Sequence, residues 1–144
     1  MTMKTVLIAQ DNADTRWIMK YAFMKKGFIT LETGRGNHVL EMVRIFRPDL
    51  MILDAQLPGM DGVEVLSRLK ADPKTWDIPI LMLGFSGLNK SILRAVKEQV
   101  EAYFDKASLN LLGLLYEADK VMEKTVQPVL EFPTRSKPVL KNAA

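Results

Sequence analysis

The amino-acid sequence predicts an α/β fold, a doubly wound sheet of five parallel strands with helices on both faces. Short apolar runs alternate with segments of helical periodicity five times along residues 5–125, a pattern typical of parallel sheets. The run Leu50–Leu53 is apolar without interruption, as expected for a strand buried on both faces. We expect the order 2-1-3-4-5, because it places the acids that follow the first and third strands side by side where the strand order reverses.

The strands are expected at the apolar runs, and most of them end in polar or small residues. The first run ends at Gln10-Asp11-Asn12, the third at Asp54, the fourth at Gly84 and the fifth at Asp105-Lys106. In order along the chain, the expected strands are Thr5–Ala9, Phe28–Thr33, Leu50–Leu53, Pro79–Leu83 and Ala102–Phe104.

The helices are expected where apolar residues recur three or four positions apart. Asn12 or Asp14 can cap the first helix, which ends at Lys25-Lys26 before Gly27, because lysine and then glycine are helix-ending signals. Prolines close the second helix at Pro48 and the third at Asp72-Pro73. The apolar faces of helices two to five are marked by Val39, Met42, Val43 and Phe46; Val65, Leu66 and Leu69; Ile92, Leu93, Val96 and Val100; and Leu111, Leu115, Ala118 and Met122.

Composition indicates one globular domain over residues 1–125, followed by a flexible tail or linker start over residues 126–144. The tail contains three prolines and little apolar periodicity. It also carries +2 of the net charge of +3, so the globular part is nearly neutral and shows no basic stripe for nucleic acid. The chain has no cysteine, which excludes disulfides and thiolate metal sites. We see no signal peptide and no apolar stretch near the ~20 residues that span a membrane, and we expect a cytoplasmic protein.

Three charged side chains are expected to meet at one edge of the sheet. Asp11, Asp54 and Lys106 each follow a strand closely, and the carboxyl ends of parallel strands share an edge. Two carboxylates suit Mg²⁺, which prefers oxygen ligands and keeps some of its waters. An ammonium group suits a phosphoryl group, for which lysine acts as a point charge.

With these residues in place, the chain resembles the receiver domain of two-component response regulators over about residues 4–125. The segment from Asp54 through Leu57-Pro58-Gly59-Met60-Asp61-Gly62 is highly specific, and three other motifs lie at matching distances along the chain. These are Val6-Leu7-Ile8-Ala9-Gln10-Asp11-Asn12, Ile78-Pro79-Ile80 and Tyr103-Phe104-Asp105-Lys106.

The resemblance implies a function and a set of site residues. Asp54 would accept a phosphoryl group from a histidine kinase or phosphorelay partner and pass the state to a protein partner that the sequence does not identify. Mg²⁺ would be held by Asp11, Asp54 and the backbone carbonyl of Gln56, and Lys106 would contact the phosphoryl group. Tyr103 matches the aromatic residue that changes rotamer on activation. The chain would be a phosphoacceptor that assists its own phosphorylation and dephosphorylation, not an enzyme in the usual sense.

Three positions depart from the family pattern. Gln10 replaces the first acid of an acidic pair, so it would reach the metal only through a water, and Mg²⁺ affinity should fall. Gly84 replaces a small hydroxyl residue. Gly84 and Tyr103 are the expected switch residues, and the hydroxyl at position 84 that would be the partner of the Tyr103 ring is missing. Ser86 lies about 6.6 Å further along an extended chain, too far to replace it unless the backbone bends. Ala107 replaces a proline, so a trans peptide is expected.

Other interpretations remain open at this point. An atypical receiver that has lost its switch could be poorly phosphorylated and act as a docking module. A haloacid-dehalogenase-like phosphatase also places a nucleophilic aspartate after a strand, but it needs a second acid at position 56, where this chain has Gln56. A dinucleotide site is disfavoured, because Gly34 and Gly36 have no third glycine to complete the fingerprint.

Overall fold

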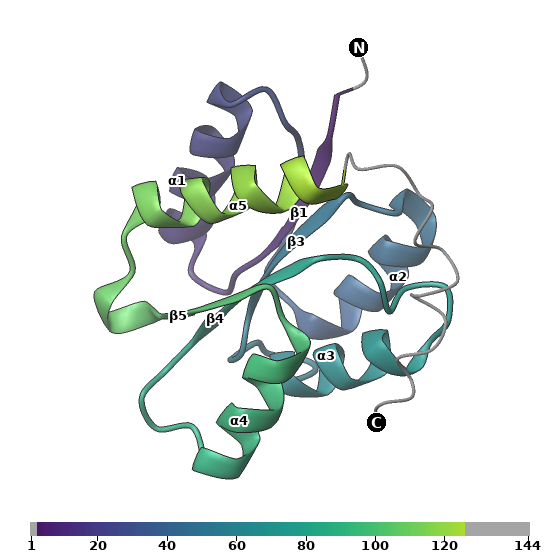
Figure 1. The fold of residues 1–144 in the computed structure, drawn as a ribbon, viewed down its shortest axis with the longest axis vertical. Helices are drawn as coiled ribbons and strands as arrows, with labels where there is room; N and C mark the ends of the chain where they lie inside the picture. Colours follow the sequence, from purple (N-terminus) through teal and green to yellow (C-terminus); the bar gives the residue numbers. More distant parts are fainter. Residues whose placement is uncertain (1–2, 126–144) are drawn as a thin grey trace.

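The computed structural model describes residues 3–125 and confirms the predicted sheet (Figure 1). All four strand pairs are parallel, and the order is β2-β1-β3-β4-β5. The residues of the expected tail, 126–144, lie outside the described part of the chain. The elements are β1 (Thr5–Ala9), α1 (Ala13–Lys25), β2 (Ile29–Thr33), α2 (Gly36–Phe46), β3 (Leu50–Asp54), α3 (Gly62–Ala71), β4 (Ile80–Gly84), α4 (Lys90–Gln99), β5 (Ala102–Asp105), a 3₁₀ turn η1 (Lys106–Ser108) and α5 (Leu111–Thr125).

The helices form a layer on each face of the sheet (Figure 1). Apolar residues of α1 and α5 share one buried cluster with one side of the strands. Those of α2, α3 and α4 share another cluster with the opposite side. Both faces of the central strands are therefore covered, and every residue of β3 and β4 is buried. This explains why these strands are continuous apolar runs and do not alternate with polar residues.

The strand boundaries differ from the expected ones by single residues. β2 begins at Ile29 and not at Phe28, because Phe28 turns back to pack edge-on against the Phe23 ring. β4 begins at Ile80, after Pro79, which has no N–H to donate to a ladder. β4 and β5 each extend one residue past the expected end, and these two extra residues, Gly84 and Asp105, pair with each other.

The ends of the first two helices follow the expected local signals. Asn12 caps α1, and its side-chain oxygen accepts the Thr15 N–H at 2.8 Å. Gly27 follows this helix with a φ of 95°, a conformation that glycine adopts without steric cost. Arg47 ends α2 in the left-handed region, with a φ of 48°, and Pro48 follows it, where a right-handed helix is disfavoured.

The topology brings the carboxyl ends of four strands to one edge of the sheet. In the ladders, Ala9 pairs with Leu53, Asp54 with Leu83, and Gly84 with Asp105. The loops that follow β1, β3, β4 and β5 therefore surround one small area, where the candidate site lies. Over residues 3–125, the structure contains no helix that is long and apolar enough to cross a membrane.

Candidate functional site

Asp54 is the last residue of β3 and is held by three hydrogen bonds. Its side chain is only 1% exposed. The Gln56 backbone N–H donates to Oδ1 at 2.8 Å. The Lys106 ammonium donates to Oδ1 at 2.9 Å and to Oδ2 at 3.1 Å. A buried carboxylate requires such partners, because an unpaired charge in the interior costs several kcal/mol or more.

Lys106 joins the end of β5 to the end of β3. It is the first residue of η1, and its side chain is 30% exposed. Besides the two Asp54 oxygens, its Nζ contacts the side-chain oxygen of Gln56 at 3.0 Å. These contacts match the three protons of an ammonium group. The role of the Gln56 side chain in this arrangement was missed from the sequence, which pointed only to its backbone carbonyl.

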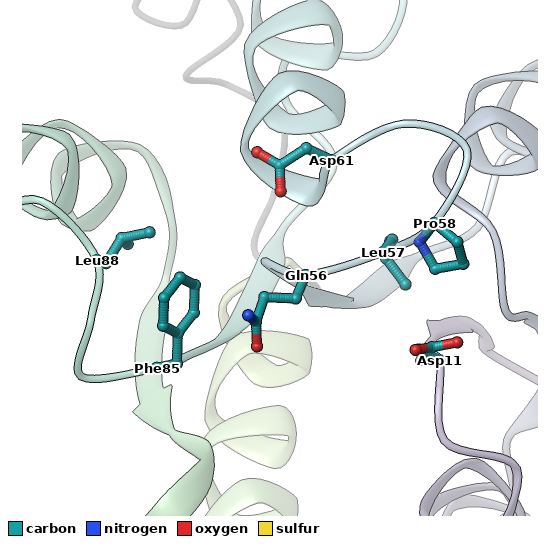
Figure 2. A pocket seen from close by; sticks show the side chains of 7 residues that line it. All are labelled: Asp11, Gln56, Leu57, Pro58, Asp61, Phe85 and Leu88. Carbon is teal, nitrogen blue, oxygen red and sulfur yellow. The ribbon is translucent and has the colours of Figure 1, made fainter.

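Asp11 lies across a surface cavity from the loop that follows β4 (Figure 2). The cavity has a volume of about 440 Å³, and Gln56 stands between its two sides. A second acid, Asp61 at the start of α3, also lines it, although the sequence indicated only that Asp61 belongs to the family motif. The lining residues are Asp11, Gln56, Leu57, Pro58, Asp61, Phe85 and Leu88.

The donor atoms at this edge fit a magnesium ion in number and chemistry. Among residues 3–125, no three His, Cys, Asp or Glu side chains are grouped so that they could hold a metal. What the edge offers is two carboxylates, on Asp11 and Asp54, and the carbonyl of Gln56. Mg²⁺ is commonly held by one or two carboxylates while it keeps several waters, so these oxygen donors are of the type that the ion prefers.

Gln10 shapes the turn that carries Asp11. Its side chain is buried, and its Oε1 accepts the Asn12 N–H at 2.9 Å. Its backbone carbonyl accepts a hydrogen bond from Arg16 at 2.8 Å, while Arg16 also pairs with Glu32. The Arg16 contact was not anticipated from the sequence, and it places a positive charge under the turn. Hydrogen bonds, chiefly from Lys20 and then from Arg16, lower the pKa of Glu32 despite its partial burial.

The Tyr103 ring fills the space beside Gly84. A Cβ atom at position 84 would lie 1.7 Å from the Tyr103 hydroxyl oxygen and 2.2 Å from Cζ. Burial and, to a lesser extent, the charge of Asp105 raise the pKa of Tyr103, while a hydrogen bond with the Phe85 backbone lowers it. Ser86 is exposed in the turn after β4, so the nearest side chain to the missing hydroxyl is Tyr103.

The peptide bond before Ala107 is trans, as expected, since residues 3–125 contain no cis peptide bond. The Ala107 N–H donates to the Asp105 carboxylate at 2.9 Å and so caps η1. A proline at position 107 could not make this hydrogen bond, because it has no N–H.

The sequence and the fold were compared with those of known proteins. The model of the response regulator receiver domain matches residues 6–112. The chain belongs to this family. Receiver domains are phosphoacceptor modules of two-component signalling rather than ordinary enzymes, they typically use Mg²⁺, and they imply a kinase partner.

Several curated proteins resemble this receiver domain. The phosphate regulon transcriptional regulatory protein PhoB of Pseudomonas aeruginosa is 34% identical over 106 residues, which cover 74% of this chain and 46% of PhoB. The polar-differentiation response regulator DivK of Brucella anthropi is 31% identical over 103 residues, 72% of this chain and 84% of DivK. Sporulation initiation phosphotransferase F of Bacillus subtilis is 39% identical over 70 residues, 49% of this chain and 56% of the relative. The match thus spans only about half the length of PhoB and of phosphotransferase F.

Solved structures show the same fold as this receiver domain. The chemotaxis response regulator CheY4 of Vibrio cholerae superimposes with a TM-score of 0.73 at 22% identity, over 83% of this chain and 98% of that chain. The N-terminal domain of a response regulator receiver protein from Methanoculleus marisnigri gives 0.66 at 30% identity, over 83% and 95%. Both likenesses support the fold described above.

Proposed function

We propose that this receiver domain accepts a phosphoryl group on Asp54 and passes that state to a protein partner. The donor is a histidine kinase or a phosphotransfer protein that carries a phosphohistidine. The observation that carries the proposal is the contact between Lys106 and both carboxylate oxygens of Asp54. That ammonium lies where a phosphoryl group on Asp54 would bring new negative charge.

The proposed transfer uses the Asp54 carboxylate and the Lys106 ammonium at this edge and a phosphohistidine donor. An oxygen of Asp54 forms a bond to phosphorus while the bond between phosphorus and the donor imidazole nitrogen breaks. The electron pair leaves with the imidazole, which takes a proton from solvent. Lys106 gives up one Asp54 oxygen and contacts a phosphoryl oxygen instead. Such transfers depend mainly on positioning and electrostatic stabilisation, and later attack by water would release phosphate and restore the carboxylate.

Magnesium would be held by Asp11, Asp54 and the carbonyl of Gln56. When bound, the ion supplies positive charge that offsets the charge of the phosphoryl oxygens. Without a first acid at position 10, the site carries one negative charge fewer than the family pattern. Gln10 would contribute through a water between it and the ion, and its side-chain oxygen also accepts the Asn12 N–H.

The proposal is tested by intact mass after incubation with acetyl phosphate and Mg²⁺. The natural sequence is expected to gain one phosphoryl group. The gain should be absent in Asp54→Asn and should be strongly reduced by a chelator. An unmodified natural protein, or an Asp54→Asn variant with an undiminished gain, would overturn the proposal. An unmodified protein would also favour the alternative interpretation, a docking module that does not depend on phosphorylation.

Adding an acid at position 10 is expected to tighten magnesium binding. In Gln10→Glu the new carboxylate keeps the size of the side chain and the oxygen that accepts the Asn12 N–H. A single anion about 6 Å from a divalent cation contributes about 1.4 kcal/mol in water, or about tenfold in affinity, and this is the smallest gain expected at the buried position 10. Calorimetric titration with Mg²⁺ measures the change.

The matched control is Gln99→Glu, which adds the same charge at the exposed end of α4. This control is expected to leave the magnesium affinity within about twofold of the natural protein, because solvent and salt screen distant exposed charges. Equal affinities for Gln10→Glu and Gln99→Glu would show that position 10 does not influence the ion.

A further inference from the structure

The Tyr103 ring occupies the space between β4 and β5 that a side chain at position 84 would need. Gly84 is buried at the end of β4. A Cβ added there would approach three Tyr103 atoms, at 1.7, 2.2 and 2.5 Å. Contacts under 3.0 Å are essentially never made by real Cβ atoms. Even an alanine at position 84 is therefore incompatible with this position of the Tyr103 ring, which we call the inward position.

Neighbouring elements on this side of the sheet hold the ring inward. Tyr103 pairs with Met82 in the β4–β5 ladder, and its side chain packs against the buried cluster beneath α2, α3 and α4. The Lys97 ammonium, on α4, lies 5.4 Å from the ring centroid, within the range of a cation–π interaction.

We propose that Gly84 gives Tyr103 a permanent place, so that the ring stays inward whether or not Asp54 carries a phosphoryl group. A ligand or modification shifts an equilibrium only when it interacts differently with the two states. A side chain at position 84 could link the two sites by moving between Asp54 and the ring, but glycine has none. The part of the proposal that concerns phosphorylated protein rests on the proposed function.

A ring that stays inward would affect how the domain meets a protein partner. The face formed by α4 and β5 would be the same in the resting and the phosphorylated protein, at least where Tyr103 contributes to it. A partner that binds this face would then recognise both forms with similar affinity. The phosphorylated state would then be passed on through contacts outside this face, and this follows from the absence of one side chain at position 84.

The inference is tested with fluorine NMR on protein labelled with 3-fluorotyrosine. The chain has three tyrosines, and the other two, Tyr21 and Tyr116, are 51% and 63% exposed and provide reference signals. In the natural sequence the Tyr103 signal is expected to be shielded from a soluble paramagnetic probe. It should not move when beryllium trifluoride and Mg²⁺ are added. A Tyr103 signal that shifts on this addition would overturn the proposal.

Two substitutions at position 84 should release the ring. In Gly84→Ala and Gly84→Thr the Tyr103 signal is expected to broaden with the paramagnetic probe as the Tyr21 and Tyr116 signals do. In Gly84→Thr it should also respond to beryllium trifluoride, because the new hydroxyl can contact the phosphoryl mimic. A signal that stays as shielded in Gly84→Ala as in the natural protein would contradict the steric basis of the proposal.

Two further measurements keep the outcomes separate. Bound beryllium trifluoride has its own fluorine signal, so a failure of the mimic to bind is seen directly and counts against the proposed function. The comparison of the natural protein with Gly84→Ala in the absence of the mimic still tests the role of Gly84. If Gly84→Ala folds poorly, it is combined with Tyr103→Ala. In the Tyr103→Ala background, Gly84→Ala is then expected to lower the free energy of unfolding by less than it does in the natural background. The reason is that the new Cβ no longer collides with the Tyr103 ring. Equal costs in the two backgrounds would refute the proposal.

Discussion

Replacing Lys106 with methionine is expected to slow phosphorylation of Asp54 by acetyl phosphate by about 10- to 100-fold. The ammonium makes hydrogen bonds of 2.9 and 3.1 Å to the carboxylate. A hydrogen bond to a charged group contributes about 1.5–3 kcal/mol, and each 1.36 kcal/mol is about tenfold in rate. Methionine keeps much of the length of the lysine side chain but has no charge and no donor. The rate is read from the mass gain as a function of time at saturating Mg²⁺.

The control for this variant is Lys74→Met, at an exposed position in the loop after α3. It loses the same charge and should keep the natural rate. Circular dichroism should confirm that Lys106→Met is folded, because removal of one partner from a buried pair destabilises proteins. A folded Lys106→Met protein that is modified as fast as the control would show that this lysine does not assist the transfer.

Gly62→Ala is expected to destabilise the domain by about 3 kcal/mol, the upper end of the usual cost of overpacking. Gly62 begins α3, and its backbone N–H donates to the Ala55 carbonyl at 3.0 Å. A Cβ there would lie 1.9 Å from the Asp54 carbonyl oxygen and 2.8 Å from the Ala55 Cα. Both neighbours are main-chain atoms of the segment that carries Asp54, so they cannot rotate out of the way as a side chain could.

The free energy of unfolding is measured by urea denaturation. Gly113→Ala in α5 is the matched control, because a Cβ there would have no neighbour closer than 3.8 Å. Alanine in a helix is more favourable than glycine by roughly 0.5–1 kcal/mol, so this control should be neutral or stabilising. Gly62→Ala and Gly113→Ala proteins of equal stability would show that the close approach of α3 to β3 can relax at little cost.

The architecture was accessible from the sequence because its signals are local and mutually consistent. The apolar run Leu50–Leu53 predicted a strand covered on both faces, and the strand is buried throughout. Asn12 was predicted as a possible cap of the first helix, and its side chain does cap that helix. Once parallel strands are inferred, their carboxyl ends must share an edge. For this reason Asp54 and Lys106, 52 positions apart, could be expected to approach each other, and they do.

Within the site, the sequence could identify residue types but not the orientations of their side chains. Gln56 was singled out for its carbonyl, yet its side chain contacts Lys106. Gln10 was considered as a neutral substitute for an acid, and its oxygen accepts an N–H of the turn. Such contacts depend on rotamers, which are chosen by the space and the hydrogen-bond partners that several elements create together.

The sequence by itself determined the fold class, the strand order and the edge at which the charged residues meet. Each of these follows from periodicity and from the geometry of parallel strands. Only the tertiary structure decided that Tyr103 lies in the volume left free by Gly84. Position 84 could be read as a missing hydroxyl, but whether a neighbour fills the space depends on close packing between two strands. Such packing is settled only when β4 and β5 come together in register.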